Sequence, residues 1–381
     1  MTVAKHEKRI PYLDGLRGYS ILAVVLDHLI GGSEWHQHHR WLQDSVANST
    51  LGVRIFFVIS GYLITTLLLR EQDRRGTISI RGFYERRIAR IFPAFYLFVA
   101  VMAILNAFHL VYLSLASFMA AITYTWNVAF FWRKGLGGWG DNNELFGHVW
   151  TLSIEEQFYL VWPSCLVYLG RKWSKRLAIA MIVLLPCVRL FSFFFLHESK
   201  LRSTLLARSA QDQILWGVLA AFLMTGDIDI LERLKNFRYK ASVLFGSLLL
   251  LFASDPFLSS YKASGMEAWL VPTLQGVGTV GLMLWLWSGT GGILRRVLES
   301  WPAVQLGLLS YSLYIWQQPF TRWSRMDFLP APVRALGALL VAALCYYLVE
   351  VPMRRRIRGW FSQNETSSKA AVGEQDTPVT Q

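Results

Sequence analysis

Apolar residues gather along this chain in long runs, and short polar segments rich in arginine separate the runs. An α-helix rises 1.5 Å per residue, so roughly 20 apolar residues are enough to cross the hydrocarbon core of a bilayer. The clearest runs cover residues 11–32, 51–69, 149–169, 177–196, 207–225, 241–254, 267–288, 303–322 and 333–351. The pattern predicts an all-α fold, a polytopic bundle of membrane helices.

Residues 91–131 are apolar but leave two arrangements open: two spans, or one span with a re-entrant or interfacial piece. The basic segments favour the second arrangement, because one net crossing puts all of them on the same side, as expected of cytoplasmic loops. These segments lie at 70–90, 171–176, 231–240, 293–298 and 353–358. We therefore expect about ten transmembrane helices, with both termini in the cytoplasm.

The composition agrees with a membrane protein, since 54% of the 381 residues are hydrophobic and only 17% are charged. The net charge of +13 needs no nucleic-acid partner, because the basic residues lie mostly between the apolar runs. All three cysteines fall inside apolar runs, which indicates neither a disulfide framework nor a metal cluster. We expect a membrane domain over residues 1–360 and a disordered cytoplasmic tail over residues 361–381.

The first run, PYLDGLRGYSILAVVLDHLIGG, carries Asp14, Arg17, Asp27 and His28. An ionisable group in hydrocarbon costs on the order of 2.5–3.5 kcal/mol, so such residues are usually retained for function. Arg17 and His28 are eleven residues apart, which puts them on nearly the same helix face and roughly 16 Å apart along the axis. This spacing suits an elongated ligand lying along the helix. The alternative is that the charges only mark the two ends of a span.

Two further stretches combine charge with apolar runs. In FYERRIARIFPAFY, Arg87 and Arg90 are one turn apart and, joined by Arg86, would make a phosphate-sized site. The alternative is a plain basic flank at the cytoplasmic end of a span. In FGHVWTLSIEEQFYLVWP, Glu155 and its neighbour Glu156 enter a span between aromatic residues, where carboxylates are costly unless they serve as an interfacial cap or in function.

The loop after the first run contains His36, His38 and His39. Three close histidines can hold a metal ion, but no cysteine or carboxylate arrangement supports one here. An exposed loop is the better supported interpretation, and we expect no metal site.

These stretches, in this order, resemble the acyltransferase-3 family of integral membrane O-acyltransferases. The resemblance is carried by LDGLRGYSILAVVLDH with its R-x10-H spacing, GVRIFFVISGYLI, YERRIARIFPAFY and GHVWTLSIEEQFYLVWP, and it resumes at LSYSLYIWQQP and VEVPMRR. It covers residues 10–356. Carried over by position, the resemblance makes His28 the essential histidine, Arg17 its partner, Arg87 and Arg90 the R-x-x-R pair, and Glu155 the acidic residue.

The resemblance implies an acyl-CoA-dependent O-acyltransferase in the plasma membrane, the inner membrane of a bacterium. Such proteins take an acyl group, usually acetyl, from cytoplasmic acyl-CoA and pass it to a hydroxyl of a carbohydrate or lipid-linked glycan at the far membrane face. No permanently bound cofactor is implied, because acetyl-CoA is a substrate. The Arg87–Arg90 pair would hold the CoA phosphates, and Arg17 would contact the donor where its thioester passes toward His28.

Transfer from a thioester to a sugar hydroxyl needs a base, and a histidine is suited to that role. His28 acts either directly on the acceptor or as a transient acyl carrier, and the sequence leaves both open. Asp27 is about 100° around the helix and is poorly placed to orient His28, so Glu155 is the candidate for that task. The rival function is a secondary transporter or exporter that uses the same intramembrane charges as a substrate or proton path.

Two positions depart from the family pattern. Thr151 replaces the serine of a W-S-L motif and keeps the hydroxyl. Gln317 stands where the late motif often has a histidine, and because an amide does not titrate we assign it no acid–base role. The sequence carries no hydrolase-like segment after the last run, so we expect no delivery of the acyl group by a fused domain.

Overall fold

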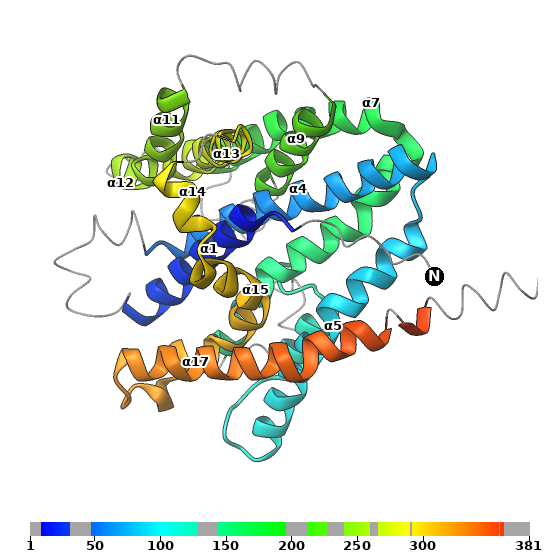
Figure 1. Cartoon of the computed structure of the whole chain (residues 1–381). Helices are drawn as coiled ribbons and strands as arrows, with labels where there is room; N and C mark the ends of the chain where they lie inside the picture. The colour runs from blue at the N-terminus through cyan, green and yellow to red at the C-terminus, as the bar shows by residue number, and fades with distance from the viewer. Residues whose placement is uncertain are drawn as a thin grey trace, which may run out of the picture.

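The computed structural model describes residues 9–30, 47–128, 143–195, 212–226, 240–259, 266–289, 292–357 and 359–361. Within these ranges every regular element is helical and no strand occurs, which confirms the all-α prediction (Figure 1). The three histidines of the first loop and the tail from residue 362 lie outside the described residues.

The helices follow the predicted runs closely. In chain order they are α1 (Pro11–Ile30), α4 (Ser49–Arg75), α5 (Ile80–Ala107), α6 (Leu115–Ile122), η3 (Asn143–Phe146), α7 (Val149–Phe195), α9 (Asp212–Gly226), α11 (Lys240–Phe252), α12 (Ser254–Ser259), α13 (Met266–Trp287), α14 (Ile293–Leu298), α15 (Trp301–Trp316), α16 (Gln318–Thr321), η5 (Ser324–Met326), α17 (Ala331–Cys345) and the π-helical turn η6 (Tyr346–Glu350). Helix α7 joins two predicted spans and breaks at Gly170, whose φ of 71° lies in the left-handed region that favours glycine.

Four helices among the described residues are long and apolar enough to cross a membrane: Ser49–Arg75, Ile80–Ala107, Leu270–Trp287 and Ala331–Phe361. Helices α9 and α11 are apolar but shorter. The open region 91–131 holds the end of α5, which is one continuous helix, and then the eight-residue α6. Helix α5 is long enough for one crossing and α6 is too short for another, and the number of crossings stays a prediction.

Helix α1 packs against both α4 and α15. Its contact with α15 is a backbone contact, because a Cβ on Gly18 would collide with the carbonyl of Ala303, and a Cβ on Gly307 would collide with the carbonyl of Asp14. The apolar face of α1 enters two buried clusters, through Ile21 and Val24 in one and through apolar residues of its first turns in the other. This packing fixes where the charged residues of α1 point.

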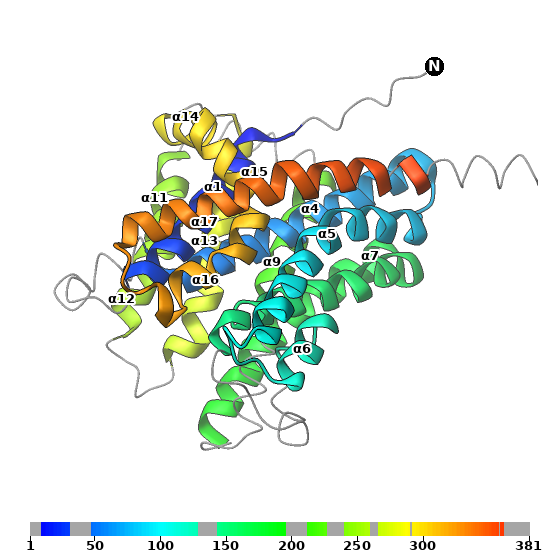
Figure 2. The same ribbon diagram turned by 90° about the horizontal axis from the view of Figure 1, so that it is seen from below.

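The last helix lies along one side of the bundle, and Figures 1 and 2 show α17 there in two views. It packs on α15, and its π-helical turn η6 packs on α5. The ends of α1, α4, α5 and this last helix that carry arginines meet at one end of the bundle, around the cavity described below.

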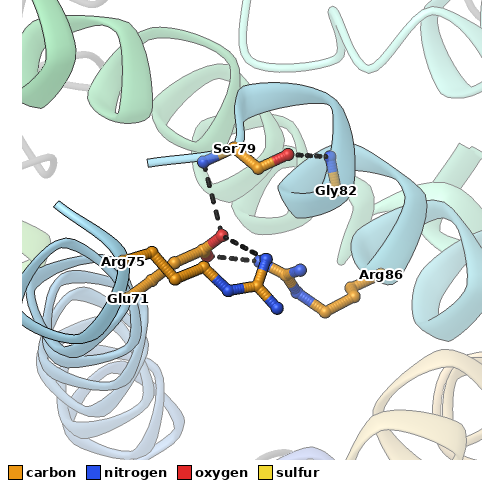
Figure 3. A network of polar contacts seen from close by, with 5 residues as sticks. All are labelled: Glu71, Arg75, Ser79, Gly82 and Arg86. Atoms are coloured by element: carbon orange, nitrogen blue, oxygen red, sulfur yellow. Dashed lines mark hydrogen bonds and ion pairs between the residues drawn. The ribbon is translucent and has the colours of Figure 1, made fainter. Parts of the chain in front are cut away.

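The connection between α4 and α5 is held by Glu71 (Figure 3). Its carboxylate accepts a hydrogen bond from the backbone N–H of Ser79 at 3.3 Å and pairs with Nη2 of Arg86 at 2.9 Å. Arg75 lies 3.8 Å from the same carboxylate. Gly76, with a φ of 73°, ends α4 and lets the chain turn back, so the two helices form a hairpin.

Candidate functional site

A cavity of about 260 Å³ lies where the first turns of α1 meet α4, α5, α15 and the last helix. We call it the basic cavity, because the arginines that line it outnumber the carboxylates. Its charged residues are Arg9, Arg17, Arg70, Arg87, Arg90 and Arg354, with Asp14 and Glu350. A concave surface with this charge is suited to an anion that carries several negative groups, such as a nucleotide with phosphates.

Arg87 and Arg90 both line the basic cavity, as the R-x-x-R spacing on one face of α5 predicts. The guanidinium of Arg87 lies over two aromatic rings, 4.9 Å from the centroid of Tyr159 and 5.6 Å from that of Phe83. Cation–π contacts of this kind hold the side chain in place. Arg86 was expected to join the pair, and that prediction is wrong: Arg86 pairs with Glu71 in the hairpin and does not line the cavity.

The sequence interpretation missed the contribution of the last helix. Its π-helical turn places Tyr346 and Glu350 in the wall of the basic cavity. The hydroxyl of Ser312 donates to the buried carboxylate of Glu350 at 2.9 Å, and Arg354 lies 3.9 Å from the same carboxylate. Turns of π-helix are frequent at functional sites, but the motif VEVPMRR gave no sign of one.

A second, smaller space of about 50 Å³ adjoins the basic cavity, and we call it the polar chamber. Arg17 and Tyr311 line both spaces and so mark the neck between them. The other polar residues of the chamber are Ser60, Thr151, Glu155, Ser310 and Tyr314, and its apolar wall is Val53, Phe56, Phe57 and Leu152. Four helices, α1, α4, α7 and α15, therefore bring the sequence motifs together.

Glu155 lies in the polar chamber, where its carboxylate accepts hydrogen bonds from the hydroxyls of Ser60 and Tyr159. Asp14, Glu155 and Glu350 all interact electrostatically with Arg17. The sequence made Glu155 the candidate to orient His28. The structure gives it hydroxyl partners, however, and it does not hydrogen-bond to His28.

His28 has a different partner. Its Nδ1 lies 2.9 Å from Oε1 of Gln317, the buried amide that replaces the family's histidine. The hydroxyl of Thr321 donates to the same oxygen at 2.9 Å. His28 lines neither the basic cavity nor the polar chamber.

The chamber nevertheless reaches toward the His28 end of the bundle through Tyr314, which lies one turn before Gln317 on α15. The hydroxyl of Tyr314 lies 2.5 Å from that of Thr151 and donates to the carbonyl of His148 at 3.3 Å. Thr151 thus keeps a hydrogen-bonding role for the hydroxyl at the altered W-S-L position. Arg17, Glu155, Arg87 and Arg90 gather around two adjoining spaces, and His28 lies three turns of α1 beyond Arg17.

Within the part of the chain that the structure describes, no group of three or more histidine, cysteine or acidic side chains could hold a metal ion. The chemistry available at and around the two spaces is that of arginines, carboxylates, hydroxyls and the imidazoles of His28 and His148. These groups can bind an anionic donor, move a proton and polarise a carbonyl.

Among known proteins, the chain is similar to several that are named as O-acetyltransferases. The chain is 26% identical to the peptidoglycan O-acetyltransferase OatA of Listeria monocytogenes, over 93% of this chain and 57% of the relative. It is 26% identical to the putative peptidoglycan O-acetyltransferase YrhL of Bacillus subtilis, over 92% of this chain and 56% of the relative. It is 24% identical to the O-acetyltransferase OatA of Staphylococcus aureus, over 91% and 57%.

The chain therefore spans little more than half the length of the curated relatives it matches. No solved structure matches it. Residues 10–350 match the family described as an acyltransferase domain, which includes every residue of the basic cavity and polar chamber except Arg9 and Arg354. The chain belongs to the acyltransferase-3 family.

Proposed function

We propose that this protein is a membrane O-acetyltransferase that moves an acetyl group from cytoplasmic acetyl-CoA to a hydroxyl of a carbohydrate or lipid-linked glycan at the far membrane face. The observation that carries the proposal is the neck at Arg17, where a basic cavity suited to an anionic group adjoins a polar chamber. The three matched relatives named as O-acetyltransferases support the acetyl group, and two of these names support a peptidoglycan-like acceptor.

The donor would enter by the basic cavity. CoA carries its phosphates at one end and its thioester at the other, with a flexible chain between them. Arg87 and Arg90, together with the other arginines of the cavity, are suited to the phosphates, since charge-assisted hydrogen bonds to phosphate are among the strongest in proteins. The thioester would then pass Arg17 into the polar chamber.

His28 would carry the acid–base chemistry in one of two ways. As a base, the imidazole takes the proton of the sugar hydroxyl, the sugar oxygen attacks the thioester carbonyl, and the C–S bond breaks. The CoA thiolate then takes the proton back. As an acyl carrier, the imidazole first forms a C–N bond to the acetyl carbon and releases the thiolate, and the sugar hydroxyl attacks in a second step. Both routes give the same ester and free CoA.

The proposal includes a topology. About ten crossings with both termini in the cytoplasm place the basic cavity on the cytoplasmic side and the His28 end of α1 toward the outside of the plasma membrane. The four long apolar helices and the gathering of arginines at one end of the bundle support this orientation.

Reconstitution tests the function. The purified protein in lipid nanodiscs is given acetyl-CoA labelled in the acetyl group and a soluble oligosaccharide from peptidoglycan, and mass analysis looks for an added acetyl. We expect transfer by the wild type and at least a hundredfold loss in His28→Ala, which removes the imidazole. A His28→Ala protein that inserts normally and acetylates at the wild-type rate would remove His28 from the mechanism.

The same preparation separates the enzyme from the rival transporter. An enzyme consumes acetyl-CoA and releases CoA in step with the ester formed. A transporter binds no acetyl-CoA and moves a glycan across a sealed vesicle without changing its mass. Solute movement without CoA release would overturn the proposed activity.

A further inference from the structure

The side chain that hydrogen-bonds to His28 is a neutral amide. Gln317 ends α15 and has no exposed surface. Its Oε1 lies 2.9 Å from Nδ1 of His28, and Thr321 donates its hydroxyl hydrogen to the same oxygen at 2.9 Å. A carbonyl oxygen has two lone pairs, so it can accept from both groups at once.

With Oε1 of Gln317 toward the ring, this geometry favours one position for the proton of a neutral His28. An oxygen only accepts hydrogen bonds, so its partner on the imidazole ring must be an N–H. With the hydrogen on Nδ1, the lone pair is on Nε2. The hydrogen bond made by one ring nitrogen thus sets the role of the other.

We propose that Gln317 is a positioning residue for acetyl transfer, which holds His28 in the tautomer whose Nε2 is the basic and nucleophilic atom. The inference rests on the proposed function for its reaction, but the tautomer itself can be observed without it. If His28 acts as a base, the hydroxyl proton of the acceptor goes to Nε2 and leaves again with the CoA thiolate. If it carries the acetyl group, the new C–N bond forms at Nε2 while the C–S bond breaks.

An amide differs from a carboxylate in this position because it cannot take up the Nδ1 proton. That proton therefore stays on the ring throughout, and an acetyl group on Nε2 gives an acetylimidazolium, which bears a positive charge. A cationic acyl group of this kind is a better acetyl donor than a neutral acylimidazole, since the ring leaves as neutral imidazole. Gln317 is thus suited to either route without joining the proton transfer.

The other charged or titratable groups that act on His28 are Asp27 from its own helix, Arg322 just beyond α16 and His148 just before α7. None of them replaces the hydrogen bond of Gln317 to Nδ1 in the structure. Gln318, the next residue, provides a matched control: it is 4% exposed and its side chain has no hydrogen bond to His28.

The experiment uses Gln317→Glu and Gln317→Leu, with Gln318→Glu and Gln318→Leu as controls, in the full chain in nanodiscs. The first measurement is ¹⁵N NMR of protein labelled in histidine, in which His28→Gln identifies the signals of His28. We expect Nδ1 of the wild type to be protonated and Nε2 to be unprotonated near neutral pH.

The second measurement is the pH profile of kcat/KM for acetyl-CoA. A carboxylate at position 317 still accepts the hydrogen bond from Nδ1 and also stabilises the imidazolium. Gln317→Glu should therefore move the acid limb of the profile to higher pH by about one unit or more. Gln317→Leu should lower kcat about tenfold, the value of roughly one well-made hydrogen bond, with KM for acetyl-CoA changed less than about twofold. The Gln318 variants should leave the limb where it is.

Three results would overturn the proposal: a hydrogen on Nε2 in the wild type, a Gln317→Leu protein with wild-type kcat and pH profile, or an equal shift in Gln318→Glu. A wild type that transfers no acetyl group would instead overturn the proposed function, and the NMR measurement would still decide the tautomer.

Discussion

Arg86 and Arg87 are neighbours in sequence but have different surroundings. Arg87 lies on the face of α5 that lines the basic cavity, together with Arg90, while Arg86 faces the turn between α4 and α5 and pairs with Glu71. The three arginines have the same chemistry and lie on the same helix. Substitutions of these arginines can therefore distinguish donor binding from the general effect of losing a basic residue near the membrane.

Replacing Arg87 and Arg90 together with Ala should raise KM for acetyl-CoA at least about tenfold, because each charge-assisted contact to a phosphate contributes roughly 1.5–3 kcal/mol. KM for the acceptor should change little. Arg86→Ala, the matched control, should leave both constants within about twofold, since an exposed ion pair contributes at most about 1 kcal/mol. Calorimetry with acetyl-CoA checks the donor affinity directly. Normal binding by the double variant would make the pair a topogenic flank only.

Glu155→Gln should give the opposite kinetic pattern. The substitution removes a negative charge near Arg17 in the polar chamber but leaves every arginine of the basic cavity in place. We expect kcat to fall about tenfold or more with KM for acetyl-CoA nearly unchanged, which is the signature of a contact that matters in the transition state. Steady-state kinetics at saturating acceptor measures both. A large rise in KM with unchanged kcat would place Glu155 in donor binding instead.

At the scale of elements, the close approach of α1 and α15 fixes the site. A Cβ on Gly307 would collide with the backbone carbonyl of Asp14, and backbone cannot move aside as a flexible side chain can. Gly307→Ala should therefore cost about 1–3 kcal/mol, the usual range for overpacking, and lower the Tm in detergent. Gly246→Ala in α11 is the control, because nothing lies within 4 Å of its added Cβ. Equal Tm values for the two variants would contradict this close packing.

The sequence predicted the helices well because long apolar runs leave few alternatives in a membrane. By its resemblance, the sequence also suggested that Arg17 lies on the donor path with Arg87 and Arg90, and all three line the basic cavity. It could not predict contacts that depend on how distant helices pack. Gln317 as the partner of His28 is one example, and Glu350, brought into the cavity by a π-helical turn, is another.

The ion pair of Arg86 is another contact that the sequence could not predict. Sequence spacing alone put Arg86, Arg87 and Arg90 in one group, although neighbouring residues on a helix differ by about 100° in direction. The carboxylate that draws Arg86 away, Glu71, belongs to the preceding helix. The hairpin between α4 and α5 brings the two side chains together, as Figure 3 shows.

At the scale of the whole molecule, the orientation in the membrane can be measured. Reporter fusions after Gly76 in the α4–α5 turn should report the cytoplasm, and fusions near Asn142 should report the outside, because α5 is one continuous helix and α6 has only eight residues. An enzyme reporter active only on one side of the membrane checks each site. A cytoplasmic signal near Asn142 would mean two crossings in this region and would reverse the placement of Glu155.

The neck at Arg17 also bears on the electrical insulation of the membrane. If the two spaces and the His28 end were joined by water, they would be a leak for protons, and each charge that crosses 100 mV dissipates about 2.3 kcal/mol. A fixed positive charge between the two spaces repels protons and metal cations, as arginines do in selective pores. The same charge attracts an anionic donor. Arg17 would thus let the cell pass acetyl groups outward through a wetted protein while keeping its proton gradient.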